Sequence, residues 1–506
     1  MVQANGKKTS YTYNSKKQVI TTIDNEKAVN YSYNDKNLLE KISSGTKDYL
    51  FTYDEFLKNK DVKIGQNITL INNNYESNDG NLISSTYGNG DVISYTYDEF
   101  DRVEKVIKQD ATYTYKYDNN GNLAKILSSK ENIKYKYDFY QKLHSFMNND
   151  FSIGYKFDKN NNVINKKISL SNSTFNEARE FNKENCLSKL YIGNNVFEYE
   201  YDELGRIQNK KINNNSLTKY GYVTLGKKTS RLINYVNNNG NITKYRYDKM
   251  KNITHIYINN VLTNRYFYDL NNQLIREDNY RLATTTKYKY DLEGNILSKK
   301  ICHLNTDEVI TVNNYTYGDS SWEDRLTKFN DKNITYDEIG NPTTIGQNIT
   351  LNWINGRELN SCTIDNKIIN YDYNIDGIRT SKKINGVETK YYLENSKIIV
   401  EKTNNNMIYY IYDDLGSIIG FKYNNEMYYY MKNLQNDIIE ILDSNLNSIC
   451  KYTYDSFGNI LSIVNNNGLD ISNDESHIAN INPFRYRSYY YDKETKLYYL
   501  NSRYYN

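Results

Sequence analysis

The chain has 506 residues, a formal net charge of +3 and a mean hydropathy of −0.83, and 55 of its residues are Tyr. Its 64 Lys and Arg residues are interspersed with 61 Asp and Glu residues, so no basic stripe predicts a nucleic-acid-binding surface. No apolar run of about 18 residues predicts a membrane span. The first residues also lack the apolar segment of a signal peptide, so we expect neither feature in this chain.

A short unit, Tyr-x-Tyr-Asp, recurs at a spacing of twenty residues, at 95–98, 115–118 and 135–138, and many further copies follow. The alternating tyrosines point to one face of a strand, and the residue between them points to the other face. The Asp can accept hydrogen bonds from the backbone N–H groups that follow it. A Gly three residues later supplies a positive φ. Each unit therefore predicts a β-hairpin.

The aspartates and glycines of these turns are predicted to be structural rather than catalytic, because they are numerous and regular. The residues are Asp98, Asp118, Gly121, Asp202, Gly205, Asp291, Gly294, Asp455 and Gly458. The adjacent pair Asp413 and Asp414 is expected in a turn as well, since neighbouring strand residues point to opposite faces and do not share a proton.

A single hairpin is marginally stable in water, so neighbouring hairpins are expected to pair side by side into one sheet. About forty strands at a spacing of ~4.8 Å would make a sheet roughly 190 Å wide. Side chains cannot fill the curvature of such a sheet. The sequence therefore predicts an all-β fold, with tandem hairpins in one long curved antiparallel sheet that forms a hollow or spiralling β-shell.

From residue 315 onward the regular spacing loosens, and residues 482–506 place Pro, Phe, Arg, Asp and Leu at fixed offsets among tyrosines. The residues of this C-terminal signature are Pro483, Phe484, Arg485, Tyr486, Tyr491, Asp492, Leu497, Tyr498, Tyr499, Arg503, Tyr504 and Tyr505. The signature resembles the one that closes the core of RHS/YD-repeat proteins. By this resemblance, residues 1–314 would be the YD-repeat strands of the shell and residues 315–506 the repeat-associated core that closes it.

The resemblance implies a function. In RHS/YD-repeat proteins such as bacterial polymorphic toxins, insecticidal toxin complex C components and teneurins, the repeats form a shell. In the toxins a C-terminal toxin is held inside it, and many members free the toxin by self-cleavage just after the core. We expect a non-catalytic encapsulating shell whose toxin cargo and cleavage segment lie outside this chain. A secreted or cell-surface location would then belong to a longer protein.

Other chemistries receive little support from the sequence. Neither the four Cys nor the four His residues have the spacing of a metal site or a catalytic arrangement, so no cofactor is expected. Exposed tyrosines could stack on sugar rings, although Trp, which is preferred in many such sites, is present only as Trp322 and Trp353. The alternative to the shell is therefore a surface module that binds cell-wall glycans or other carbohydrates.

Overall fold

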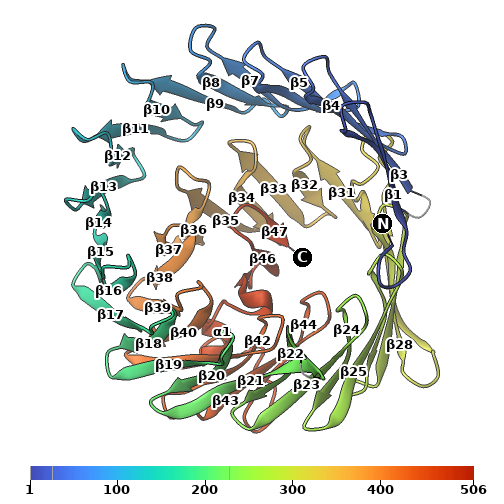
Figure 1. The fold of residues 1–506 in the computed structure, drawn as a ribbon, viewed down its shortest axis with the longest axis vertical. Coiled ribbons are helices and arrows are strands. Elements are labelled where there is room, and N and C mark those ends of the chain that lie inside the picture. The colour runs from blue at the N-terminus through green and yellow to red at the C-terminus, as the bar shows by residue number, and fades with distance from the viewer. Residues whose placement is uncertain (1, 25–26, 227, 506) are drawn as a thin grey trace. The chain divides into compact units, whose positions relative to one another are not determined.

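The computed structural model describes residues 2–24, 27–226 and 228–505 of the chain. By their contacts the residues form two compact units: unit 1 is residues 1–112 with 244–366, and unit 2 is residues 113–243 with 367–506. Strands β1–β44 belong to one sheet and β45–β47 to a small second sheet. Figure 1 shows the succession of hairpins from blue to red. The prediction of an all-β fold of tandem hairpins is confirmed.

The strands of unit 1 come from both of its segments. They are β1 (Thr9–Tyr13), β2 (Val19–Asp24), β3 (Lys27–Tyr33), β4 (Leu39–Ser44), β5 (Lys47–Tyr53), β6 (Asn59–Ile64), β7 (Ile68–Tyr75), β8 (Leu82–Tyr87), β9 (Val92–Tyr97), β10 (Val103–Ile107), β24 (Ile253–Ile258), β25 (Val261–Tyr268), β26 (Leu274–Asn279), β27 (Thr284–Tyr290), β28 (Ile296–His303), β29 (Val309–Thr316), β30 (Lys328–Phe329), β31 (Lys332–Tyr336), β32 (Pro342–Ile345), β33 (Ile349–Ile354) and β34 (Glu358–Ile364).

Unit 2 also contains the only helical segments of the described residues, α1 (Ile478–Ile481) and the 3₁₀ turn η1 (Tyr486–Ser488). Its strands are β12 (Leu123–Leu127), β13 (Asn132–Tyr137), β14 (Leu143–Asn148), β15 (Phe151–Phe157), β16 (Val163–Leu170), β17 (Ser173–Phe181), β18 (Leu187–Ile192), β19 (Asn195–Tyr201), β20 (Ile207–Ile212), β21 (Asn215–Leu225), β22 (Lys228–Asn238), β35 (Lys367–Tyr373), β36 (Arg379–Ile384), β37 (Val387–Glu394), β38 (Lys397–Thr403), β39 (Asn406–Tyr412), β40 (Ile418–Tyr423), β41 (Glu426–Lys432), β42 (Ile438–Leu442), β43 (Ser448–Tyr454), β44 (Ile460–Asn465), β45 (Tyr490–Asp492), β46 (Leu497–Tyr499) and β47 (Tyr504–Tyr505). Two further strands, β11 (Thr112–Tyr117) and β23 (Asn241–Tyr247), include the residues at which the units change.

The repeat turns have one recurring geometry, which the hairpin after β11 illustrates. The Asp118 Oδ1 atom accepts from the backbone N–H groups of Asn120 and Asn122, both at 2.9 Å. Gly121 follows with a φ of +84°, and β12 then pairs antiparallel with β11. The corresponding positive-φ position is occupied by Gln141 and Asn161 in the next two repeats, so it favours Gly without requiring it.

The second Tyr of each unit has a role that the alternation pattern did not reveal. The Tyr137 hydroxyl donates to the carbonyl oxygen of Leu123 at 3.0 Å, which lies in the preceding hairpin. The same bond, to a carbonyl 14 to 16 residues earlier, is made by Tyr33, Tyr53, Tyr75, Tyr97, Tyr201, Tyr222, Tyr268, Tyr290, Tyr412 and Tyr454. A ladder of tyrosine hydroxyls therefore ties these hairpins to the ones before them.

Unit 2 is built in layers around an aromatic core, and two adjacent tyrosines of β39 show how. Tyr409 stacks on Phe175 of β17 with ring centroids 4.6 Å apart, whereas Tyr410 faces Phe484 at 4.8 Å. Strands β15–β20 thus form a first layer, β36–β43 a second layer, and residues 478–505 cover the opposite face of the second layer (Figure 1). Because both faces of β39 are buried, its sequence is almost continuously apolar or aromatic.

Unit 1 relies more on polar contacts between its segments. Lys108 pairs with Glu358 at 2.8 Å, and both side chains are largely buried. Asn355 donates to Asp110 at 3.0 Å and accepts from the backbone N–H of Gln109. The predicted boundary at residue 314 falls inside β29, and both units contain residues from each side of it. The division into repeats and core stays a prediction from the sequence.

Candidate functional site

The C-terminal signature lies against the second layer of unit 2. Phe484 packs edge-on against Tyr410 and also against Tyr490, whose ring centroid is 5.6 Å away. Tyr430 of β41 donates its hydroxyl to Asn482 at 2.6 Å, on the face opposite to that of its neighbour Tyr429. The signature is therefore attached to β39 and β41 through side chains that alternate with those facing the first layer.

Tyrosine hydroxyls hold the rest of the signature to backbone carbonyls of the hairpin turn after β43. Tyr498 donates to Gly458 at 2.8 Å, and Tyr505 donates to Phe457 at 2.6 Å. Tyr486 donates to the carbonyl of Ser456 at 3.0 Å. Since a carbonyl buried beneath aromatic rings is costly to leave without a donor, these bonds explain why the positions carry Tyr rather than Phe.

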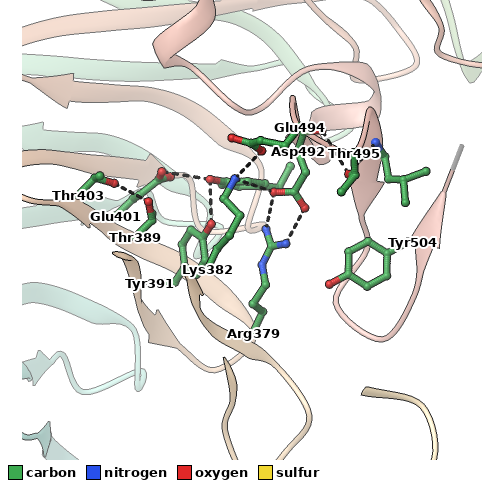
Figure 2. Close-up of polar contacts among 12 residues, drawn as sticks. Arg379, Lys382, Thr389, Tyr391, Glu401, Thr403, Asp492, Glu494, Thr495 and Tyr504 are labelled. Carbon is green, nitrogen blue, oxygen red and sulfur yellow. Dashed lines mark hydrogen bonds and ion pairs between the residues drawn. The ribbon is translucent and has the colours of Figure 1, made fainter. Parts of the chain in front are cut away.

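A buried charge cluster lies at the end of β45. The Asp492 carboxylate, 0 % exposed, receives two hydrogen bonds from Arg379, Nη1 to Oδ2 at 2.6 Å and Nη2 to Oδ1 at 3.3 Å. Lys382 Nζ lies 3.1 Å from Asp492 Oδ1 and 2.9 Å from Glu494 Oε2. Figure 2 shows Arg379 and Lys382, both from β36, converging on Asp492. Two cations and two carboxylates thus join the signature to the second layer.

The guanidinium of Arg379 is surrounded by aromatic rings. Its Cζ atom lies 4.2 Å from the ring centroid of Tyr499, 5.1 Å from that of Tyr490 and 5.0 Å from that of Tyr391. Its backbone N–H donates to the Tyr499 hydroxyl at 2.8 Å. Ring faces attract a cation, and they exclude the water that would otherwise screen the Arg379–Asp492 pair.

A second carboxylate, Glu401 of β38, lies close to this cluster. It accepts hydrogen bonds from Tyr410 at 2.8 Å and from Tyr490 at 3.1 Å. Tyr490 also lies 3.2 Å, oxygen to oxygen, from Tyr391 of β37. The signature strand β45 is therefore bound to three neighbouring strands of unit 2, β36, β37 and β38.

Burial and charge shift the pKa values in this cluster in opposite directions. Burial would raise the pKa of Asp492, but the charges of Arg379 and Lys382 outweigh it and lower that pKa. Burial raises the pKa of Glu401, despite the hydrogen bond from Tyr410 and the nearby charge of Lys382, which lower it. Burial also raises the pKa of Tyr391 to about 12. The arrangement holds Asp492 ionised and the tyrosines neutral, as a structural ion pair requires.

A comparable buried cluster joins the two layers of unit 2. Glu177 of β17, 1 % exposed, lies 2.6 Å from Arg179 and 3.2 Å from Lys166. The Tyr409 hydroxyl donates to Glu177 from the second layer. Lys166 reaches Glu394 of β37 at 3.0 Å. Charge pairs among aromatic side chains are thus used at both interfaces of the second layer.

The remaining predicted residues lie where their roles can be read directly. Pro483 is buried, Leu497 is half-buried and Arg503 is exposed. Each Asp of the repeat turns accepts backbone N–H groups of its own hairpin turn, as Asp98, Asp202 and Asp455 show. Arg379 and Lys382 stand in the chain segment that resembles the core, but their pairing with Asp492, over 100 positions away, was not foreseen. Their one signal in the sequence is a strand that carries three cations, Arg379, Lys382 and Lys383.

Residues with catalytic or metal-binding chemistry are dispersed. His477 caps α1 by accepting the backbone N–H of Ala479 at 3.1 Å. The four cysteines are free thiols. Within the described part of the chain, no group of three or more His, Cys, Asp or Glu residues is arranged to hold a metal ion. No helix there is long and apolar enough to cross a membrane.

Comparison with known proteins gives matches along the whole chain. The family model described as teneurin YD-shell matches residues 79–279. A crystal structure of TcdB2-TccC3-Cdc42 matches 99% of this chain and 32% of that chain with a TM-score of 0.70 at 13% identity. The Photorhabdus luminescens Tc holotoxin pore matches 99% of this chain and 32% of that chain with a TM-score of 0.61 at 13% identity. These structures share the fold.

Curated relatives add sequence similarity. The tRNA nuclease WapA of Bacillus subtilis (strain 168) is 33% identical over 241 residues, which are 46% of this chain and 10% of the relative. The tRNA3(Ser)-specific nuclease WapA of Bacillus spizizenii is 31% identical over 241 residues, which are again 46% of this chain and 10% of the relative. The chain is an RHS/YD-repeat protein. This RHS/YD-repeat chain matches only about a tenth of the length of its WapA relatives.

Proposed function

We propose that this RHS/YD-repeat chain is a non-catalytic shell that confines a C-terminal polypeptide toxin. The observation that carries the proposal is the match of nearly the whole chain to the RHS fold of the TcdB2-TccC3 structures. WapA relatives that are named as nucleases support a toxin as the confined polypeptide. In this account the nuclease or other toxic activity belongs to the cargo, and a longer secreted or cell-surface protein contains both.

The geometry of unit 2 indicates how a continuing polypeptide would be held. Residues 482–505 cover the face of the second layer that lies away from the first layer. Tyr504 is tied to Tyr373 of β35 by a hydroxyl contact of 2.9 Å. A polypeptide that continued from Tyr504 would therefore begin on that face. Confinement needs no specific contacts. A cargo that stays unfolded inside the shell loses little conformational entropy, and this entropy is lost only when the cargo folds after release.

Protease protection tests this function. A small reporter domain is joined after residue 506 through a flexible tail, within the longest natural protein that contains this chain, and is exposed to a nonspecific protease. We expect the joined reporter to resist digestion while the same reporter, added free to the same mixture, is cleaved. A second fusion places the reporter at the N-terminus as a matched control. Equal digestion of all three reporters would contradict confinement.

A carbohydrate-binding surface module remains the second candidate, and one observation favours it. Phe139 and Tyr140, in the turn after β13, are 90% and 83% exposed, and their rings contact each other at 5.5 Å. Exposed aromatic faces can stack on sugar rings. Retention of the chain on purified peptidoglycan, lost when both residues are changed to Ser, would support this candidate. Equal retention of the double variant would remove it.

A further inference from the structure

Arg485 of the signature is a buried cation that the protein leaves without a counter-ion. The side chain is 4% exposed, and among the described residues no carboxylate lies within 4 Å of it. Its guanidinium lies 4.8 Å from the ring centroid of Tyr491 and 5.5 Å from that of Tyr452. Its Nη2 atom donates to the Ala479 carbonyl at 3.4 Å, and its buried Nε atom has no partner in the described part of the chain.

Such an arrangement is costly, and the same signature shows the usual solution. A buried guanidinium loses its hydration, and a carboxylate with hydrogen bonds to it ordinarily offsets that loss. Arg379, also buried among tyrosines, is matched by Asp492. Arg485 has the aromatic rings without the carboxylate. An anion that bound here would therefore be attracted by one specific cation, the Arg485 guanidinium.

A cavity of about 370 Å³ borders Arg485. Two other cations line it, but both are paired: Lys382 with Asp492 and Glu494, and Lys493 with Glu475 at 3.5 Å. Lys493 and Glu475 are exposed, so the cavity has a rim that meets solvent. Apolar side chains from β36, β37 and β39 complete the walls: Ile384, Val387 and Ile408. Arg485 is thus the unmatched charge of a small, partly apolar cavity.

We propose that Arg485 and the walls of this cavity bind a carboxylate group. A planar carboxylate matches the fork of guanidinium N–H donors, and the apolar walls suit the short carbon chain behind it. A dianion such as inorganic phosphate fits less well, because Glu401, Glu475 and Glu494 also line the cavity and would repel the second charge. The carboxylate comes either from a free organic acid or from an acidic side chain of a polypeptide.

The test uses the chain alone, at constant pH and ionic strength, with chloride as the reference anion. Binding is followed by saturation-transfer NMR of the ligand and by the midpoint of thermal unfolding. The probes are acetate, the capped peptide Gly-Glu-Gly, and their neutral counterparts acetamide and capped Gly-Gln-Gly. The variants are Arg485→Gln and, as a matched control, Arg503→Gln, which changes an exposed Arg of the same signature.

We expect saturable binding of the carboxylate probes but not of their amides. Binding should be roughly tenfold or more weaker in Arg485→Gln and unchanged in Arg503→Gln, since charge-assisted hydrogen bonds of this kind contribute about 1.5–3 kcal/mol and about 1.4 kcal/mol is tenfold. Tighter binding of acetate than of the Glu peptide assigns the site to free organic acids, and the reverse order assigns it to polypeptides.

Three results would overturn the site: no saturable binding of either acid, equal binding of acids and amides, or equal binding by wild type and Arg485→Gln. If Arg485→Gln does not fold, the comparison of acids with amides on wild type still decides. Arg485→Lys, which keeps the charge but loses the fork, should then bind weakly rather than not at all. Because no cargo is present, this outcome is independent of the protease-protection result.

Discussion

Asp118 ends a strand of the repeats and Asp492 ends a strand of the signature, but the two carboxylates have different surroundings. Asp118 is half-buried and accepts backbone N–H groups of its own turn. Asp492 is fully buried and accepts from Arg379 and Lys382, which lie over 100 positions earlier. In the repeats the residue specifies a local turn, whereas in the signature it joins two distant parts of the chain.

The difference shows how tolerance to substitution is distributed. A local turn can be made by several residue types, and Asn34 accepts from Lys36 and Leu38 in the same way as Asp118 does in its turn. A buried pair does not tolerate a change of one member alone, since this leaves the other charged and dehydrated. We infer that the repeats can diverge in sequence while the signature and its partners on β36 cannot.

The largest expected effect separates these two aspartates directly. Asp492→Asn leaves Arg379 and Lys382 buried with a neutral partner, and the free energy of unfolding should fall by about 3–5 kcal/mol. Asp118→Asn keeps the turn acceptor, so its change should stay within about 0.5 kcal/mol. Urea unfolding followed by tyrosine fluorescence measures both. Equal destabilisation would show that the signature is no more constrained than a repeat turn.

Two turn glycines extend the comparison. Gly458 has a φ of +96°, and a Cβ there would lie 2.5 Å from the Tyr486 ring; Gly205 has a φ of +71° with no atom within 4 Å of its Cβ position. Ala at either position is strained by about 1–2 kcal/mol, and overpacking adds about 1–3 kcal/mol at Gly458 only. The midpoint of thermal unfolding should therefore be much lower for Gly458→Ala than for Gly205→Ala. The reverse order would contradict the close packing of Tyr486 of the signature against the turn at Gly458.

The tyrosine ladder offers a milder contrast. Tyr412→Phe leaves the buried carbonyl of Ile398 without its donor, and we expect a loss of about 1–2 kcal/mol. Tyr33→Phe removes the same kind of bond to Val19 where water can replace it, so its cost should be below about 1 kcal/mol. Phe157 already occupies the equivalent position in one repeat. Denaturant unfolding of both variants and of wild type measures these losses. Equal stability of all three proteins would show that the tyrosine hydroxyl bonds do not stabilise the fold.

The smallest effect concerns a lysine outside the signature. Burial and the neighbouring Lys210 lower the pKa of Lys432 to about 7, below the ordinary value of the unfolded chain. Between pH 7 and the ordinary pKa of a lysine, the unfolded state binds more protons than the folded state does. The free energy of unfolding should therefore rise with pH, by on the order of 1 kcal/mol from pH 7 to 8.5. Below pH 7 the destabilisation is fully present. Lys432→Met should lose this rise, whereas an unchanged pH dependence would contradict the shift.

The pKa of Lys382 shifts in the opposite direction to that of Lys432. Lys382 is buried, at 7% exposure, yet its pKa is raised, because the charge of Asp492 outweighs burial. Lys432 donates from Nζ to the Ser417 hydroxyl at 3.0 Å. The signature thus supplies the counter-charge that raises the pKa of a buried lysine, whereas burial lowers the pKa of Lys432.

The sequence predicts the local structure well and the long-range pairings poorly. Tyr-x-Tyr-Asp followed by Gly specifies strand, turn and return, since each step depends on residues within about five positions. The partner of the Tyr137 hydroxyl is a backbone carbonyl, which has no sequence signature. The partners of Asp492 depend on which strands of the second layer the signature covers, and residue patterns do not encode that choice. A missed signal was the unbroken apolar run of β39, which indicates two buried faces.

The central claim is that buried charges anchor the signature to the second layer, while the repeats are held by local turns. Hydrogen–deuterium exchange of wild type and Asp492→Asn tests it most directly. We predict that the amides of β45 and β46 are protected as strongly as those of β39 in wild type and lose protection in the variant, while β13 and β14 are unchanged. Retained protection of β45 and β46 in Asp492→Asn, or an equal loss in β13 and β14, would contradict the claim.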